Sequence, residues 1–105
     1  MKREQIDQEI KNIVQQLVEK YRPEKIILFG SAVKGKFGSD SDLDFLVIKE
    51  DKTRHLKVEQ KLHKIINYNI ATDFLFLRPK EVAKRLNLGD FFLKEVFEKG
   101  KVLYG

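Results

Sequence analysis

Three aspartates are spaced so that their carboxylates can meet on one face of a sheet. Asp42 and Asp44 open one apolar run of the sequence, and Asp73 stands in a later one. Side chains alternate between the two faces of a strand, so Asp42 and Asp44 point the same way. Clustered carboxylates repel one another, and Mg²⁺ or Mn²⁺ ions relieve that repulsion. Two such ions can hold both the attacking and the leaving oxygen of a phosphoryl-type displacement.

A glycine–serine pair precedes the acidic pair. Gly30-Ser31 directly follows the apolar run 26–29, and Lys34 comes soon after it. A glycine at the end of a strand lets backbone N–H groups approach an anion, and a serine hydroxyl adds a donor. These residues predict a phosphate-binding turn, to which Lys34 adds positive charge. The spacing matches neither a Walker A loop nor the dinucleotide-binding glycine pattern.

Hydrophobic periodicity predicts the elements that must position these residues. Apolar residues at spacings of three and four indicate four helices, over 3–21, 53–68, 79–86 and 90–99. Apolar or alternating runs indicate four short strands, over 25–29, 42–48, 70–77 and 101–104. The predicted fold class is α/β, a small mixed sheet of three to four strands with helices packed on it. The connection from 29 to 42 allows either an antiparallel return or a short crossover.

Aromatic residues of the second half of the chain are expected in the core, namely the phenylalanines at 74, 76, 91, 92 and 97. Phe91 and Phe92 are adjacent on one expected helix, so one of them could instead lie at the surface and mark a partner contact. His55 and His63 share the helix predicted over 53–68. We interpret both histidines as surface or helix-packing residues.

Composition narrows the class of protein. Residues 1–105 fit one domain, and the absence of cysteine excludes disulfides, thiolate nucleophiles and Cys-based metal sites. The N-terminus is charged and no apolar run approaches a membrane span, which indicates a cytoplasmic protein without a membrane partner. The net charge of +5 fits a phosphate-bearing partner and a solvated lysine-rich surface equally well.

Taken in order, these motifs resemble the DNA polymerase β-type nucleotidyltransferase superfamily, and most of all its minimal nucleotidyltransferases, the MntA-like antitoxins. The stretch LFGSAVKGKFGSDSDLDFLV carries the Gly-Ser motif, with Gly35, and the Asp-x-Asp pair. The later TDFLFL carries the third acid, and EKGKVLYG resembles the usual end of the domain. The chain departs from the family at Ala32, where members often carry Arg or Tyr.

The resemblance implies a nucleotidyltransferase fold and the transfer of AMP from ATP to a hydroxyl group, with pyrophosphate as the leaving group. Asp42, Asp44 and Asp73 would be the catalytic residues and the ligands of two Mg²⁺ ions, or of Mn²⁺ in their place. Gly30 and Ser31 would grip the phosphates. Asp73 would also orient or deprotonate the attacking hydroxyl.

The acceptor is expected to be another protein. The chain ends soon after the expected catalytic core, which leaves no room for an acceptor-binding domain. The resemblance then implies a hetero-oligomer with a HEPN-family toxin, whose tyrosine receives AMP, as in a type VII toxin–antitoxin pair. The alternatives are an antitoxin that acts by binding without catalysis, and a nucleotidyltransferase for a small molecule or nucleic acid, although nucleic acid is not the expected partner.

Overall fold

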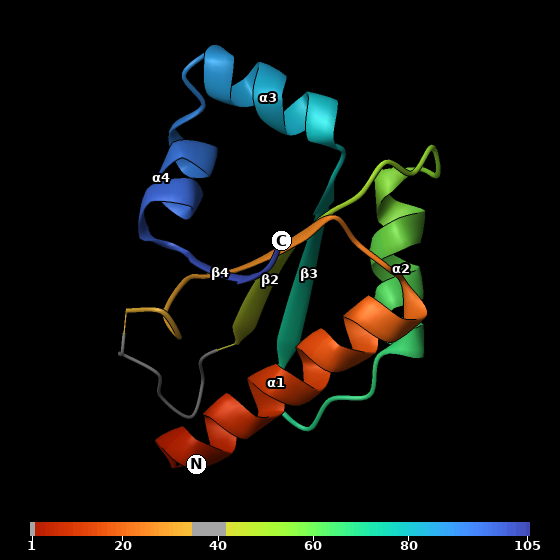
Figure 1. Ribbon diagram of the computed structural model, residues 1–105, viewed down its shortest axis with the longest axis vertical. Coiled ribbons are helices and arrows are strands. Elements are labelled where there is room, and N and C mark those ends of the chain that lie inside the picture. Colours follow the sequence, from red (N-terminus) through yellow and green to blue (C-terminus); the bar gives the residue numbers. More distant parts are fainter. Residues whose placement is uncertain (1, 35–41) are drawn as a thin grey trace.

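A mixed sheet forms the centre of the fold (Figure 1). The structure is a computed structural model that describes residues 2–34 and 42–105. The strands of the sheet are β1 (Lys25–Phe29), β2 (Leu43–Ile48), β3 (Thr72–Leu77) and β4 (Lys101–Tyr104), in the order β3-β2-β1-β4. β2 runs parallel to β3, whereas β1 runs antiparallel to both β2 and β4. The connection from β1 to β2 is therefore the antiparallel return.

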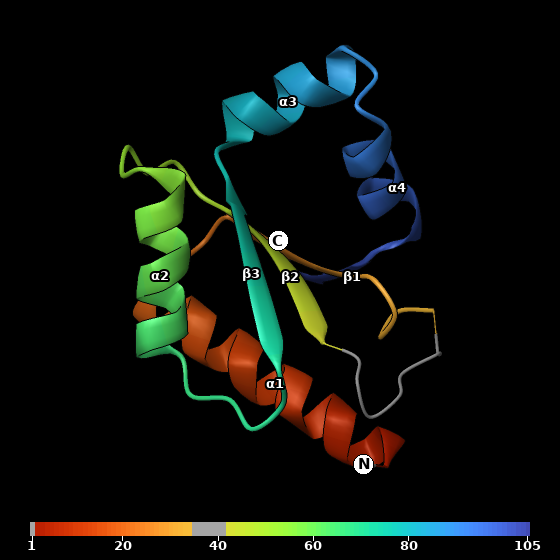
Figure 2. The same cartoon turned by 180° about the vertical axis from the view of Figure 1, so that it is seen from behind.

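The helices are α1 (Arg3–Lys20), α2 (His55–Ile65), α3 (Pro79–Asn87) and α4 (Phe91–Lys99). α1 and α2 cover one face of the sheet, and α3 and α4 lie on the other (Figures 1 and 2). The α/β fold class with a small mixed sheet is thus confirmed. Among the described residues, no helix is both long enough and apolar enough to span a membrane.

Each face of the sheet has its own core. Ile13 and Leu17 of α1 pack into the larger core with Phe45 of β2, and all three are fully buried. Leu46 of β2 points the other way, into a smaller core with Leu93 of α4. β2 is therefore buried on both faces, which holds the start of this strand in a fixed position.

The helix predicted over 53–68 is shorter at both ends than expected. At its C-terminal end, the Gln16 side chain of α1 exchanges two hydrogen bonds with the backbone of Asn67, each 2.7 Å long. Lys20 Nζ donates to the carbonyl of Ile65 at 2.9 Å. These contacts satisfy the end of α2 through α1, so the chain leaves the helix at Ile66, which has extended backbone angles.

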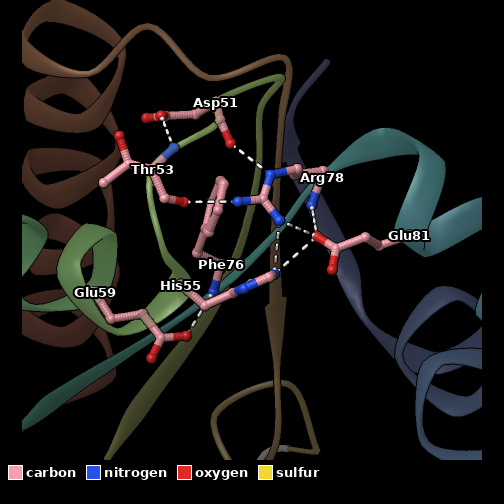
Figure 3. Close-up of polar contacts among 7 residues, drawn as sticks. All are labelled: Asp51, Thr53, His55, Glu59, Phe76, Arg78 and Glu81. Carbon is pink, nitrogen blue, oxygen red and sulfur yellow. Dashed lines mark hydrogen bonds and ion pairs between the residues drawn. The ribbon is translucent and has the colours of Figure 1, made fainter.

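Arg78 holds the chain that precedes α2 outside the helix (Figure 3). Its guanidinium donates to the carbonyls of Asp51 at 2.6 Å and Thr53 at 2.7 Å. Glu81 Oε1 lies 3.3 Å from Arg78 Nη1 and 2.8 Å from His55 Nε2. This network is at the C-terminal ends of β2 and β3, the opposite ends of these strands from their aspartates.

The expected burial is confirmed for two of the five phenylalanines. Phe74 and Phe76 are buried, whereas Phe91, Phe92 and Phe97 are 84%, 42% and 37% exposed. α4 buries Leu93 and Val96 against the sheet, and three-residue spacing gives that helix one narrow inward face. The phenylalanines of α4 lie outside this face, so their side chains are left accessible to a partner or a ligand.

Candidate functional site

The N-terminal ends of β2 and β3 bring two of the predicted aspartates together. Asp44 pairs with Asp73 in the parallel register, and neighbouring strands lie about 4.8 Å apart. The flanking residues Leu43 and Phe45 point into the α1–α2 core, so Asp44 points toward the face that carries α3 and α4. The side chain of Asp73 is 72% exposed. One carboxylate is thus sheltered and its neighbour is open to solvent.

This arrangement shifts the pKa of Asp44. Partial burial, and after it the negative charges of Asp73 and Asp42, raise the pKa of Asp44 above its ordinary value. Asp42 is exposed and immediately precedes β2. The three aspartates are therefore close enough to interact electrically, and their field favours a cation at Asp44.

Gly30 lies directly against Asp44. Its φ is +82°, and a Cβ built on it would fall 2.5 Å from Asp44 Oδ2. The chain turns immediately afterwards, with the Val33 N–H donating to the Gly30 carbonyl at 3.2 Å. Glycine is required here for its backbone angle and for the close approach of a carboxylate. The structure therefore places the glycine–serine turn beside the acidic pair.

Two further residues of this turn differ in their surroundings. Lys34 is exposed, and its Nζ lies 3.8 Å from Glu95 Oε1 of α4. Ala32 is fully buried in the larger core, so the side chain after Ser31 cannot reach a ligand in the turn. Arg3 of α1, which the sequence analysis did not single out, donates from Nη1 to the Ala32 carbonyl at 3.1 Å. Gly35 lies outside the described residues.

His63, which the sequence analysis interpreted as a surface or helix-packing residue, also lies near the site. Its Nε2 lies 3.8 Å from Asp73 Oδ1, and its Nδ1 is 2.8 Å from the hydroxyl of Tyr68. The ring also packs edge-on against Phe74, with 5.0 Å between the ring centroids. A single histidine on a helix carries no signal for such a contact, because only the packing of α2 on β3 creates it.

The donor atoms suit a divalent cation. Within residues 2–34 and 42–105, no three His, Asp or Glu side chains converge closely enough to hold a metal ion by themselves. Mg²⁺ at phosphate-binding sites is usually held by one or two carboxylates together with phosphate oxygens, so an all-protein cage is not needed. The carboxylate oxygens at Asp44 fit this type of site, and the full ligand set of three aspartates stays a prediction.

Comparisons with known proteins identify the family and the fold of the chain. Residues 8–105 match the family model described as "Polymerase beta, Nucleotidyltransferase". The chain is 33% identical over 98 residues, 90% of its own length and 94% of the relative's, to a Methanocaldococcus jannaschii protein named "Putative protein adenylyltransferase MJ0604". A solved structure from Sulfolobus solfataricus, described as a "putative nucleotidyltransferase", has the same fold, with a TM-score of 0.61, 20% identity and coverage of 78% of this chain and 75% of that one.

Proposed function

Because this chain belongs to the polymerase β-type nucleotidyltransferase family, we propose that it transfers AMP from ATP to a hydroxyl group of a partner protein. The observation that carries the proposal is the placement of Asp44 against both Asp73 and Gly30. This placement puts a carboxylate pair next to a turn suited to phosphate. The name of the Methanocaldococcus relative, a protein adenylyltransferase, supports adenylyl transfer to protein.

Each residue of the site has a defined role in this reaction. The N–H groups and hydroxyl of Gly30-Ser31 hold the outer phosphates of ATP. Asp73, the exposed carboxylate, orients the acceptor hydroxyl and takes its proton. The hydroxyl oxygen bonds to the α-phosphorus, the bond from that phosphorus to the bridging oxygen breaks, and pyrophosphate leaves. Catalysis then comes mainly from positioning and charge neutralisation.

Asp42, Asp44 and Asp73 would hold the divalent ions, with Mg²⁺ as the expected ion and Mn²⁺ as a substitute. The raised pKa of Asp44 supports this assignment, because a group that resists ionisation among like charges gains most from a cation. When bound, the ions neutralise charge on the phosphates and on the departing pyrophosphate.

The proposed acceptor is a tyrosine of a HEPN-family toxin, which makes the protein an antitoxin. Exposed apolar side chains support a protein partner: Leu88 and Phe91, at the junction of α3 and α4, are 75% and 84% exposed. Large apolar side chains that are this exposed are typical of contact sites when they gather on one surface. A HEPN-family toxin, purified separately and then mixed with the protein, is the acceptor to be tested.

The test is transfer of label from ATP that is radioactive at the α-phosphate, in the presence of Mg²⁺. Labelled toxin is expected with the wild-type chain, and no label with Asp44→Asn. Glu98→Gln, an exposed acid on α4, is the matched control and should label normally. Absence of label on the toxin, while a reference adenylyltransferase labels its own substrate, would contradict the proposal.

The same variant, and the same labelled ATP with other acceptors, separate the alternatives. If Asp44→Asn binds the toxin and suppresses its activity as well as the wild type does, the protein neutralises by binding alone. If label instead appears on added RNA or on a small hydroxyl compound, the acceptor class is wrong while the nucleotidyl-transfer chemistry stands.

A further inference from the structure

A cavity of about 250 Å³ lies between the end of β1 and α4. Its apolar lining includes Phe29 and Val33 on the β1 side, and Phe92 and Val96 on α4. The rings of Phe29 and Phe92 pack edge to face, with centroids 5.5 Å apart. Phe92 nevertheless stays 42% exposed. The cavity thus has an aromatic wall that a flat ligand can contact.

Gly30 joins this cavity to the acidic site. It lines the cavity, and it is also the residue that Asp44 approaches. Phe29 pairs with Asp44 in the antiparallel register, so these two side chains point toward the same face of the sheet. A ligand whose phosphates rest on the Gly30-Ser31 turn therefore has the cavity within reach of its other end.

Charged side chains stand among the lining residues. Glu95 Oε1 lies 3.8 Å from Lys34 Nζ and 3.6 Å from Lys99 Nζ. An ionised carboxylate only accepts hydrogen bonds, so Glu95 favours a ligand that donates from an amino group. The two ammonium groups favour a ligand that carries phosphates nearby.

We propose that this cavity binds the base of the nucleotide, an amino-bearing purine such as adenine. The ring lies against Phe92, and the amino group donates to Glu95. This inference rests on the proposed function, because it places the phosphates at Gly30. Pockets for drug-sized molecules measure about 300–1,000 Å³, so a slightly smaller cavity suits a single base whose sugar and phosphates lie outside.

Binding is measured by isothermal titration calorimetry with Mg²⁺, using ATP and tripolyphosphate as separate probes. Stacking of a base on an aromatic ring contributes about 1–3 kcal/mol, so Phe92→Ala should weaken ATP binding about 10-fold. Tripolyphosphate has no base, and its affinity should not change. The matched control is Phe97→Ala, which removes a ring of similar exposure from the same helix outside the cavity lining and should leave both affinities unaltered.

The role of Glu95 is tested with inosine triphosphate, which carries an oxo group in place of the amino group of ATP. The wild type should prefer ATP, and Glu95→Ala should bring the ratio of the two affinities close to one. Glu95→Ala also releases Lys34 and Lys99, but this change acts on both nucleotides alike. The ratio therefore isolates the contact with the base.

Three results would overturn the inference. One is wild-type affinity for tripolyphosphate equal to that for ATP, and another is no loss of ATP affinity in Phe92→Ala. The third is an equal loss for ATP and tripolyphosphate in that variant, which would place its effect on the phosphates or the fold. If ATP binds as expected but no acceptor is ever labelled, the base site stands and the proposed transfer reaction fails.

Discussion

Replacing Gly30 with alanine tests whether the close approach of Asp44 sets the geometry of the site. The substitution imposes a side chain at φ +82° and places its Cβ 2.5 Å from Asp44 Oδ2. The chain contains a matched control in Gly89, whose φ is +81° and whose added Cβ would meet no atom within 4 Å. Gly89→Ala therefore measures the backbone strain alone, whereas Gly30→Ala adds displacement of the carboxylate.

The magnitudes follow from these two effects. A left-handed backbone costs a non-glycine residue about 1–2 kcal/mol, so both variants should lose that much stability. In Gly30→Ala the Asp44 side chain must also leave its rotamer, which adds about 0.5–1.5 kcal/mol. Domains of this size are stable by about 5–15 kcal/mol, so both variants should remain folded. Only Gly30→Ala should lose transfer activity, because the new Cβ displaces the Asp44 carboxylate from its present position.

Urea unfolding measures the stability of both variants, and label transfer measures their activity. In an Asp44→Ala background the extra cost of Gly30→Ala should disappear, because the remaining Cβ of residue 44 lies at an ordinary contact distance of 3.7 Å. Equal losses of stability for Gly30→Ala and Gly89→Ala, together with full activity of Gly30→Ala, would refute the reasoning.

Three further predictions concern the same chain. The raised pKa of Asp44 means that its ionised form opposes folding, so Asp44→Asn should be more stable than the wild type at pH 7. The gain should vanish as the pH falls below the unfolded pKa of 3.8, and urea midpoints at pH 7 and pH 3 check it. Asp51 behaves oppositely, because hydrogen bonds from Thr53 and Tyr21 hold its pKa at about 2. Its contribution is present above its unfolded pKa of 3.8 and is lost as the pH falls toward 2, so Asp51→Asn should flatten the acid limb of a plot of thermal midpoint against pH. Arg78→Ala removes charged hydrogen bonds to two backbone carbonyls and should cost about 2–3 kcal/mol in urea unfolding. It should leave ATP binding intact, and a fall in ATP affinity in folded protein would contradict the separation of this network from the site.

Local patterns were sufficient for much of the fold. The spacing of Ile6, Ile10 and Ile13 predicted α1, and the structure buries all three. The period of two along 42–48 predicted that Asp42 and Asp44 point the same way, and the structure buries Leu43 and Phe45, which flank Asp44, in the core on the other face. These inferences succeed because the face on which a side chain lies depends on neighbouring residues in the chain. The family resemblance is also confirmed. It rested on short motifs and on their order along the chain, which can be recognised without the tertiary structure.

The ends of α2 and the environment of α4 could not be predicted in this way. α2 ends at Ile65 because Gln16, far away in the sequence, satisfies the backbone beyond it. Phe92 resembles a core residue by type, but α4 buries Leu93 and Val96 instead, which leaves the Phe92 ring partly exposed beside a cavity. Long-range contacts decided both features.

The sequence by itself determined which groups this protein has for its chemistry: three carboxylates, a glycine–serine turn and no cysteine. Their order along the chain resembles that of the nucleotidyltransferase family, and this resemblance implied nucleotidyl transfer. The tertiary structure alone decided that Asp44 pairs with Asp73 and presses on Gly30, that His63 approaches Asp73, and that Lys34 faces Glu95. Sheet register and helix packing set these distances, and both depend on the simultaneous burial of apolar side chains from the whole chain.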